Sequence, residues 1–177
     1  MFELDDLHAA YLAEIQARVP GLQDPAVYPV VGQSLNLPTV LLELADAEPG
    51  QDPGTEELAI KTRWEARCVY DPTAPRAELA VRALAISVAH AVWRRGALGG
   101  GLRCGACRLE RLGPDALRPD LDSYLVWVVE WTAQIHVGQS VWDGEGVTPS
   151  QIFLGYAPRV GIPHEPEYEP IDPEGAV

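Results

Sequence analysis

Basic residues are scarce in this sequence. Its 177 residues include 13 Lys and Arg against 26 Asp and Glu, which gives a formal net charge of -13 at pH 7. Affinity for nucleic-acid phosphates comes from Lys and Arg, so this balance argues against a surface built to grip nucleic acid. An acidic surface instead favours solubility, or contact with a partner that presents basic patches.

Cysteines and long apolar runs are also few. Three unevenly placed cysteines are too few for a disulfide framework. The opening MFELDDLHAAYLAEI carries acidic residues where a signal peptide needs basic residues followed by an apolar run. The most apolar helix candidate, 79–93, is interrupted by Arg82 and His90, so we expect no membrane-spanning segment. These absences predict a soluble protein of the cytoplasm.

Regular structure is nevertheless predicted over most of the chain, whose length suits one domain and whose hydrophobic content of 47% is ordinary for a globular core. Hydrophobic periodicity and turn signals predict helices at 4–19 and 71–94, strands at 26–31, 39–45, 58–70, 106–111 and 125–141, and a turn-rich acidic loop at 47–57. The second helix is apolar on most of its circumference, so we expect it to be largely buried.

Two of these strands are unusually long. The run LVWVVEWTAQIHVGQSV, 125–141, would extend roughly 45 Å or more at about 3.3 Å per residue. Trp127, Val129, Trp131 and Ile135 share one face, which we expect to pack on the helices. On the other long strand, 58–70, either the face of Trp64 or the alternate face would pack with them. Glu130, Gln134 and His136 share the opposite face. We expect these strands to form the centre of the sheet.

The order of elements predicts an α+β fold, because strands and helices do not alternate as regular units. We expect one mixed, mostly antiparallel sheet with helices packed on one face, formed by residues 1–142. Residues 143–177 should form an extended C-terminal arm rich in Pro and Gly. This arm keeps several apolar residues, which need pockets on this subunit, on a neighbouring subunit or on another protein. An arm that wraps its own domain is the alternative.

Candidate chemistry centres on the segment CGAC, whose Cys104 and Cys107 have the spacing of half a zinc site or of a redox pair. A structural zinc site requires four ligands, and Cys68 and the four scattered histidines offer no second paired half. Inert cysteines in a strand or loop are the favoured interpretation, and a metal site or a disulfide are the alternatives.

Acidic residues form the other candidate site. Glu43, Asp46, Glu48 and Asp52 lie around the predicted turn, where a solvated loop is favoured over a calcium site because the ligand rhythm is absent. Spacing assigns no Ser-His-Asp or Cys-His arrangement. We therefore expect a protein that is not an enzyme and uses no cofactor.

Three stretches of the chain carry a resemblance to a known family. TVLLELADAEPGQDPGTEELAIKTRWEARCVYD, then an alanine-rich helix, then LDSYLVWVVEWTAQIHVG is similar to the tail-terminator family of Mu-like bacteriophages, also found in prophages and phage-tail-like particles. The segment YAPRVGIPHEPEYEPI resembles the C-terminal extension of the same proteins. The resemblance covers about residues 4–172, and GGGLRCGACRLE has no match within it.

The resemblance implies a structural protein of the virion tail or neck that is assembled in the host bacterial cytoplasm. Such proteins form a ring, usually a hexamer, on the finished end of the tail tube, stop addition of tube and sheath, and present a surface to the head connector. DNA would pass through the ring without sequence-specific binding, and an acidic channel suits this passage because like charges repel.

Assembly contacts are expected at exposed polar and aromatic positions: Glu43, Asp46, Glu48, Asp52, Glu130, Gln134, His136, Tyr156 and Tyr168. Two alternatives stay open. The first is another neck or tail-completion protein of the same particle. The second is a small cytoplasmic enzyme or metal protein that uses Cys104 and Cys107.

Overall fold

The computed structural model describes residues 4–28, 35–93, 104–115, 119–141 and 152–171. The chain divides into two units, Met1–Ser140 and Val141–Val177. The first unit comprises α1 (Leu4–Arg18), β1 (Ala26–Val27), β2 (Thr39–Pro49), β3 (Leu58–Tyr70), α2 (Ala77–Trp93), β4 (Arg108–Pro114), the 3-10 helix η1 (Pro119–Leu121) and β5 (Leu125–Val137). The second comprises β6 (Ile152–Leu154), the 3-10 helix η3 (Ile162–Glu167) and β7 (Glu169–Ile171).

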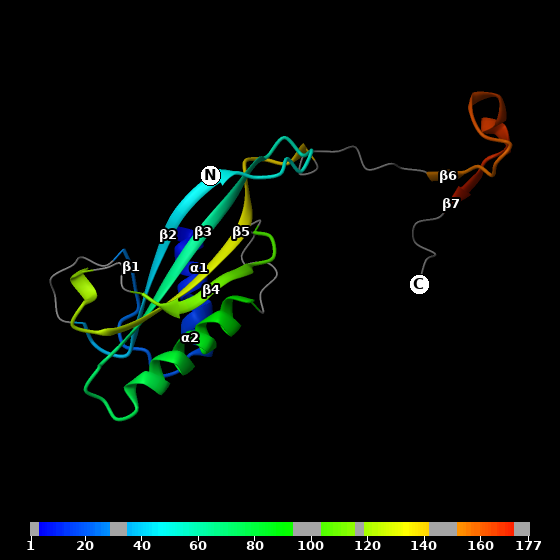
Figure 1. Ribbon diagram of the computed structural model, residues 1–177. Coiled ribbons are helices and arrows are strands. Elements are labelled where there is room, and N and C mark those ends of the chain that lie inside the picture. The colour runs from blue at the N-terminus through cyan, green and yellow to red at the C-terminus, as the bar shows by residue number, and fades with distance from the viewer. Residues whose placement is uncertain (1–3, 29–34, 94–103, 116–118, 142–151, 172–177) are drawn as a thin grey trace. The chain divides into compact units, whose positions relative to one another are not determined.

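The first unit is built on a five-stranded sheet in the order β1-β2-β3-β5-β4. Only the β1–β2 pair is parallel, and the other three pairs are antiparallel. Both helices cover one face of this sheet (Figure 1). The predicted α+β fold, with a mixed and mostly antiparallel sheet, is therefore confirmed.

The two long strands pair along their entire length, from Leu58 opposite Val137 to Tyr70 opposite Leu125. They lie at the centre of the sheet, as the sequence predicts. The strand predicted at 125–141 ends earlier, at Val137, because Gly138 follows with φ of 120°, a conformation that favours glycine.

The neighbouring strand β2 is longer than predicted. The sequence places a loop from residue 47, but β2 continues to Pro49, which lies opposite Ile60. Because β3 continues alongside, the backbone groups of β2 keep hydrogen-bonding partners. The strand therefore continues although its sequence here is typical of a loop. A register shift between Leu44 and Asp46 marks a β-bulge within this pairing.

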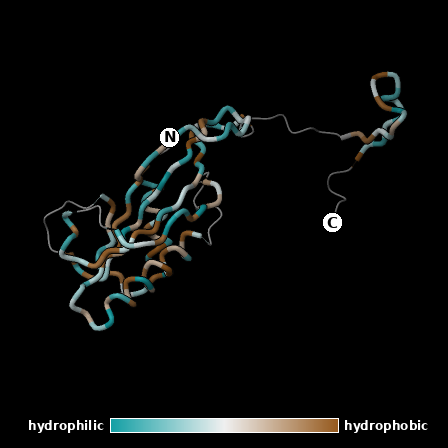
Figure 2. The backbone as a smooth tube through the Cα atoms, in the orientation of Figure 1, coloured by the Kyte–Doolittle hydropathy of each residue, from teal (hydrophilic) through white to brown (hydrophobic). Residues whose placement is uncertain are grey.

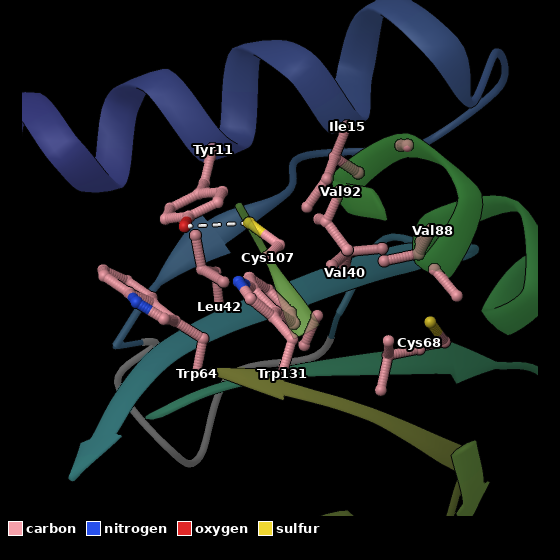
Figure 3. Packing of buried hydrophobic residues seen from close by; sticks show 14 of the residues in the cluster. Tyr11, Ile15, Val40, Leu42, Trp64, Cys68, Val88, Val92, Cys107 and Trp131 are labelled. Carbon is pink, nitrogen blue, oxygen red and sulfur yellow. Dashed lines mark hydrogen bonds between the residues drawn. The ribbon is translucent and has the colours of Figure 1, made fainter. Parts of the chain in front are cut away.

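The main core lies between the sheet and the two helices (Figure 3). Trp64 of β3 and Trp131 of β5 are fully buried, with nearly parallel rings whose centroids are 6.3 Å apart. Tyr11 of α1 packs against both, at 4.8 and 5.3 Å between ring centroids. Val129 and Ile135 lie in the same cluster. The predicted apolar face of β5 is therefore confirmed.

The opposite face of the sheet, which we call the outer face, changes character along the strands. At one end it holds a small apolar cluster of Leu41, Val69, Leu121 and Val126. At the other end it is lined by charged and polar side chains, and β2, β3 and β5 continue past the helices (Figure 1). The sheet is thus buried on both faces at one end, but presents a charged surface at the other.

Helix α2 differs from its prediction. Hydrophobic residues lie along much of its length (Figure 2), and the side that includes Val81, Ala85, Val88 and Val92 is buried in the core. On its other side, however, Leu79, Ile86 and Trp93 are 63%, 61% and 61% exposed. The expectation of a largely buried helix is therefore wrong for this side, because only one side of α2 contacts the sheet and α1.

The second unit contains regular structure that the sequence does not predict. Within the expected arm, β6 and β7 form a two-stranded antiparallel sheet in which Phe153 lies opposite Pro170. The side chain of Tyr168 supports the connection, because its hydroxyl accepts a hydrogen bond of 2.6 Å from the Gly161 amide. Its ring also lies over Gly155, where any Cβ would come within 2.6 Å of it.

Candidate functional site

The charged end of the outer face is the main candidate site. Pairing across three strands places Glu43, Glu65 and Glu130 side by side in one row. Like charges directly opposite each other destabilise a sheet unless cations neutralise them. Arg67 provides this for Glu43 and Glu65, and Arg111 contacts Glu130 at 2.8 Å.

Arg67 is the most buried of these cations. Its side chain, 8% exposed, donates to Asp115 at 2.7 Å, to Glu43 at 2.6 Å and to Glu65. Burial opposes the charged guanidinium, but the hydrogen bond to Asp115 and the charges of the three carboxylates outweigh it, so the pKa of Arg67 is raised. Arg67 thereby joins β2 and β3 to the residues that follow β4.

Beyond this network the outer face forms a shallow depression of about 330 Å³, lined mainly by charged residues from four strands: Asp46, Glu48, Lys61, Thr62, Arg63, Glu110, Glu130 and Thr132. Lys61 contacts Glu48 at 2.8 Å, whereas Arg63 lies 3.9 Å from Asp46. All four of these side chains are about half exposed or more. Such surface ion pairs contribute only about 0–1 kcal/mol each, so a partner with complementary charges can replace them at little cost.

The four predicted acidic residues do not form a turn cluster. Glu43, Asp46 and Glu48 lie on β2, each beside its own cation on β3. Asp52 lies in the following loop, where its Oδ1 accepts a bond from the Gly54 amide at 2.8 Å. The prediction that these four residues cluster around one turn is therefore wrong, because β2 extends to Pro49 and includes three of them, although the loop itself is present after Pro49.

The bulge in β2 explains this placement. Simple alternation from Glu43 would point Asp46 and Glu48 to the opposite face of the strand. The extra residue at the bulge reverses the alternation, so both carboxylates lie opposite Arg63 and Lys61 on the outer face. The charged surface therefore depends on this irregularity.

Gln134 and His136 of β5 serve the loop that follows β2. The side-chain amide of Gln134 donates to the Gln51 carbonyl at 3.1 Å and accepts from the Gln51 amide at 3.0 Å. Its Nε2 also lies 2.9 Å from Nε2 of His136. A Cβ on Gly50 would come within 3.0 Å of this amide, so glycine permits the close approach. The pair holds the loop against β5.

The two cysteines of CGAC are buried beneath α1. The hydroxyl of Tyr11 lies 3.4 Å from Cys107 Sγ (Figure 3). It also lies 3.6 Å from Cys104 Sγ. Burial raises the pKa of Cys104, raises that of Cys107 to about 11, and raises that of Tyr11. Both thiols are therefore protonated at neutral pH, which disfavours thiolate chemistry.

The alternative of a metal site at Cys104 and Cys107 receives no further ligands from the described residues. Among them, no group of three or more His, Cys, Asp and Glu side chains could hold a metal ion. Cys68 is buried and free elsewhere in the core, and burial raises its pKa. In the same part of the chain no helix is long and apolar enough to cross a membrane.

The two predicted tyrosines of the C-terminal unit have different roles. Tyr168 supports the connection between β6 and β7, as described above. Tyr156 projects from the unit with 64% of its surface exposed. Of the two, Tyr156 is therefore the more exposed.

Comparisons with known proteins find similarity among solved structures but none among family models or curated sequences. No family model matches the chain, and no curated protein sequence matches it. Among solved structures, the chain is similar to the sheath/tube terminator of an extracellular contractile injection system, PVC, determined by cryo-electron microscopy in its extended state. The identity is 14% and the TM-score 0.42, over 93% of this chain and 67% of that chain. At this level the match assigns no role to any residue of this chain.

Sequence reasoning missed Arg67, Asp115 and the exposed side of α2. Arg67 stands among alternating charges on the polar face of its strand, where it is typical of a solvated side chain. Asp115 lies 48 residues further on, so no local pattern joins the two. For α2 a signal existed, since Leu79, Ile86 and Trp93 recur every seven residues.

Proposed function

We propose that this protein is a tail terminator of a bacteriophage or of a phage-tail-like particle. It forms a ring, most simply a hexamer, on the end of the tail tube. There it stops further addition of tube and sheath subunits and provides the surface that joins the neck.

The observation that carries this proposal is the exposed apolar surface of the C-terminal unit. None of its described side chains, residues 153–171, is buried. Between 153 and 171 six large apolar side chains are exposed: Phe153, Leu154, Tyr156, Val160, Ile162 and Ile171. A segment this small cannot form a core of its own, so these side chains are expected to be buried against a partner.

The charged outer face supports the same proposal. Its strands run past the helices (Figure 1), and their ion pairs are exposed and easily exchanged. A ring that fits on a tube requires such polar surfaces, because they remain soluble before assembly and become complementary within it.

The sequence resemblance supplies the particular role. The first resembling stretch forms the β2–β3 pair and the second forms β5, which together make up the centre of the sheet. The resemblance to the C-terminal extension falls on the unit with the exposed apolar side chains. The terminator role therefore accounts for both the charged outer face and the exposed apolar side chains of the C-terminal unit.

Deletion of the gene in cells that produce the parent particle tests the proposal. Electron microscopy should show tails of uncontrolled length, and expression of the intact chain from a plasmid should restore the normal length. Tails of normal length that lack heads would instead identify another neck or tail-completion protein. Normal, complete particles would contradict both roles.

A further inference from the structure

The outward side of α2 carries an apolar surface that the fold does not use. Leu79, Ala83, Ile86, His90 and Trp93 recur at alternating spacings of four and three residues, and all are exposed. We call these five residues the α2 seam. The rings of His90 and Trp93 stack, with centroids 6.4 Å apart. This spacing is typical of a helix that packs along another element.

The α2 seam departs from the pattern of an ordinary surface helix. Such a helix places charged and polar residues on the side opposite the core. In α2 the core side is complete, since its residues pack against β3, β5 and α1. Its opposite side nevertheless keeps two large aliphatic residues and a tryptophan in water, so the apolar character of the α2 seam suits a partner better than it suits the monomer.

Charge at the edges of the α2 seam defines the partner further. Arg76 immediately precedes the helix and Arg82 lies beside the α2 seam, whereas α2 itself contains a single acidic residue, Glu78, which pairs with Arg82. This local excess of positive charge belongs to a chain with a net charge of -13. A complementary partner is therefore both apolar and acidic.

The C-terminal unit has this composition. Its exposed apolar side chains, among them Phe153 and the 81% exposed Ile162, accompany three glutamates at 165, 167 and 169 against one arginine, Arg159. We propose that the α2 seam binds the C-terminal unit of a second copy of this chain. The choice of a second copy rests on the ring assembly of the proposed function.

The C-terminal unit is held in one shape although none of its described side chains is buried. The Tyr168 hydroxyl accepts a hydrogen bond from the Gly161 amide, and pairing of β6 with β7 holds both ends of the segment together. Arg159 and His164 lie 3.3 and 3.2 Å from Glu167. A segment that is already shaped loses less conformational freedom on docking, so a small interface is sufficient.

Cross-linking between two isotopic forms of the full-length protein tests the docking. A photoreactive benzophenone amino acid is placed at position 86, and protein labelled with nitrogen-15 is mixed with unlabelled protein at the highest soluble concentration. Mass spectrometry should find α2 peptides of one label joined to peptides from 152–171 of the other. Cross-links within one label only would show that the unit docks on its own chain. Those links, links to other segments only, or no links would overturn the proposal.

Paired substitutions provide a second measurement. Ile86→Asp should weaken self-association about tenfold or more in sedimentation experiments, because it places a charge in the centre of the apolar contact. Leu58→Asp is the matched control, since Leu58 on β3 is an equally exposed aliphatic residue, and it should leave association unchanged. Arg76→Glu should also weaken association, and Glu165→Lys with Glu169→Lys in the same chain should restore it. Equal effects of Ile86→Asp and Leu58→Asp would contradict a specific role of the α2 seam.

The two proposals can fail separately. The docking is measured with purified protein alone, whereas the terminator role is measured by tail length in cells. Uncontrolled tails on gene deletion, together with an Ile86→Asp protein that still associates, would leave the function standing and overturn the docking. Normal tails on deletion, together with cross-links between copies, would overturn the terminator role and leave the docking standing.

Discussion

At the scale of single residues, tryptophan shows how strongly position decides a role. Trp64 and Trp131 are fully buried, Trp93 is mostly exposed, and Trp127 is partly buried, with the Arg82 guanidinium 4.9 Å from the centre of its ring. The first two carry much of the contact between the sheet and α1. Substitutions at chemically identical residues should therefore have very different costs.

Trp131→Ala should lower the free energy of unfolding by about 3–5 kcal/mol or prevent folding, because it leaves a large cavity beside Tyr11 and Trp64. Trp93→Ala is the matched control and should change the monomer's stability by less than about 1 kcal/mol. Chemical denaturation followed by circular dichroism measures both. A Trp131→Ala protein that unfolds like the unsubstituted chain would contradict the observed core.

Arg67→Ala should be costly for a different reason. It would leave Glu43, Glu65 and Asp115 close together without their shared cation, and loss of one partner of a buried ion network costs about 3–5 kcal/mol. Arg63→Ala, which removes an exposed arginine 3.9 Å from its partner, should cost no more than about 1 kcal/mol. Urea titration compares the two, and equal losses would contradict a special role for Arg67.

Alkaline pH should destabilise the fold through the buried thiols. Below pH 9 Cys107 is protonated in both the folded and the unfolded chain, so its contribution is complete. Between about pH 9 and about pH 11 the unfolded thiol ionises while the folded one, with its pKa raised by burial, stays protonated, so stability falls. A Cys104→Ala/Cys107→Ala protein should lose less stability over this range, as measured by denaturation at several pH values. Identical pH profiles would contradict this contribution.

At the scale of elements, each strand depends on its neighbours for more than hydrogen bonds. The bulge in β2 turns Asp46 and Glu48 toward the outer face, and a second register shift in β4, between Leu109 and Arg111, brings Arg111 opposite Glu130. Both irregularities serve the same charged surface. The loop after β2 is likewise held by a side chain of another strand, Gln134 of β5.

Gln134→Ala tests this dependence on a single loop. Loss of the side-chain amide removes both hydrogen bonds to Gln51, so exchange of the Gln51 amide hydrogen should accelerate while the rest of the sheet keeps its protection. Gln23→Ala, which removes one exposed bond to the Gly21 carbonyl, is the control and should not alter that amide. Hydrogen exchange by NMR spectroscopy measures the effect. Unchanged exchange at Gln51 would show that Gln134 does not hold the loop.

At the scale of the whole molecule, a folded sheet-and-helix unit is joined to a unit without buried side chains among its described residues. The core of the first unit draws on α1, α2 and the strands, all of which precede residue 141. We therefore expect the first unit to be sufficient for folding and the second unit to be needed for assembly.

A chain truncated after Asp143 should keep its folding transition, because every residue of the main core precedes the cut. It should fail to restore tail length in cells that lack the intact protein. Calorimetry and electron microscopy measure the two properties, and the full-length chain is the control for both. Loss of the transition would place the C-terminal unit in the monomer's core, whereas normal tails would deny it a role in assembly.

The sequence by itself determined the two helices and the long strands of the first unit and the apolar face of β5. Period-two alternation in 58–70 and 125–137 depends only on neighbouring residues, and it suffices to group the side chains of each strand on two faces and to place Trp131 toward the helices. Which face of 58–70 joins it was decided by the structure, which buries Trp64. The ring function implied by the resemblance also needs only the sequence, and it stays a prediction.

The tertiary structure alone decided the features that join distant parts of the chain. Tyr11 and Cys107 are 96 residues apart, and only packing brings them together. The bulge in β2 reverses an alternation that local reading cannot correct. The exposure of the α2 seam follows from how much of the helix its neighbours cover. These outcomes depend on which surfaces pack together, and the hydrophobic periodicity of a local segment does not determine that.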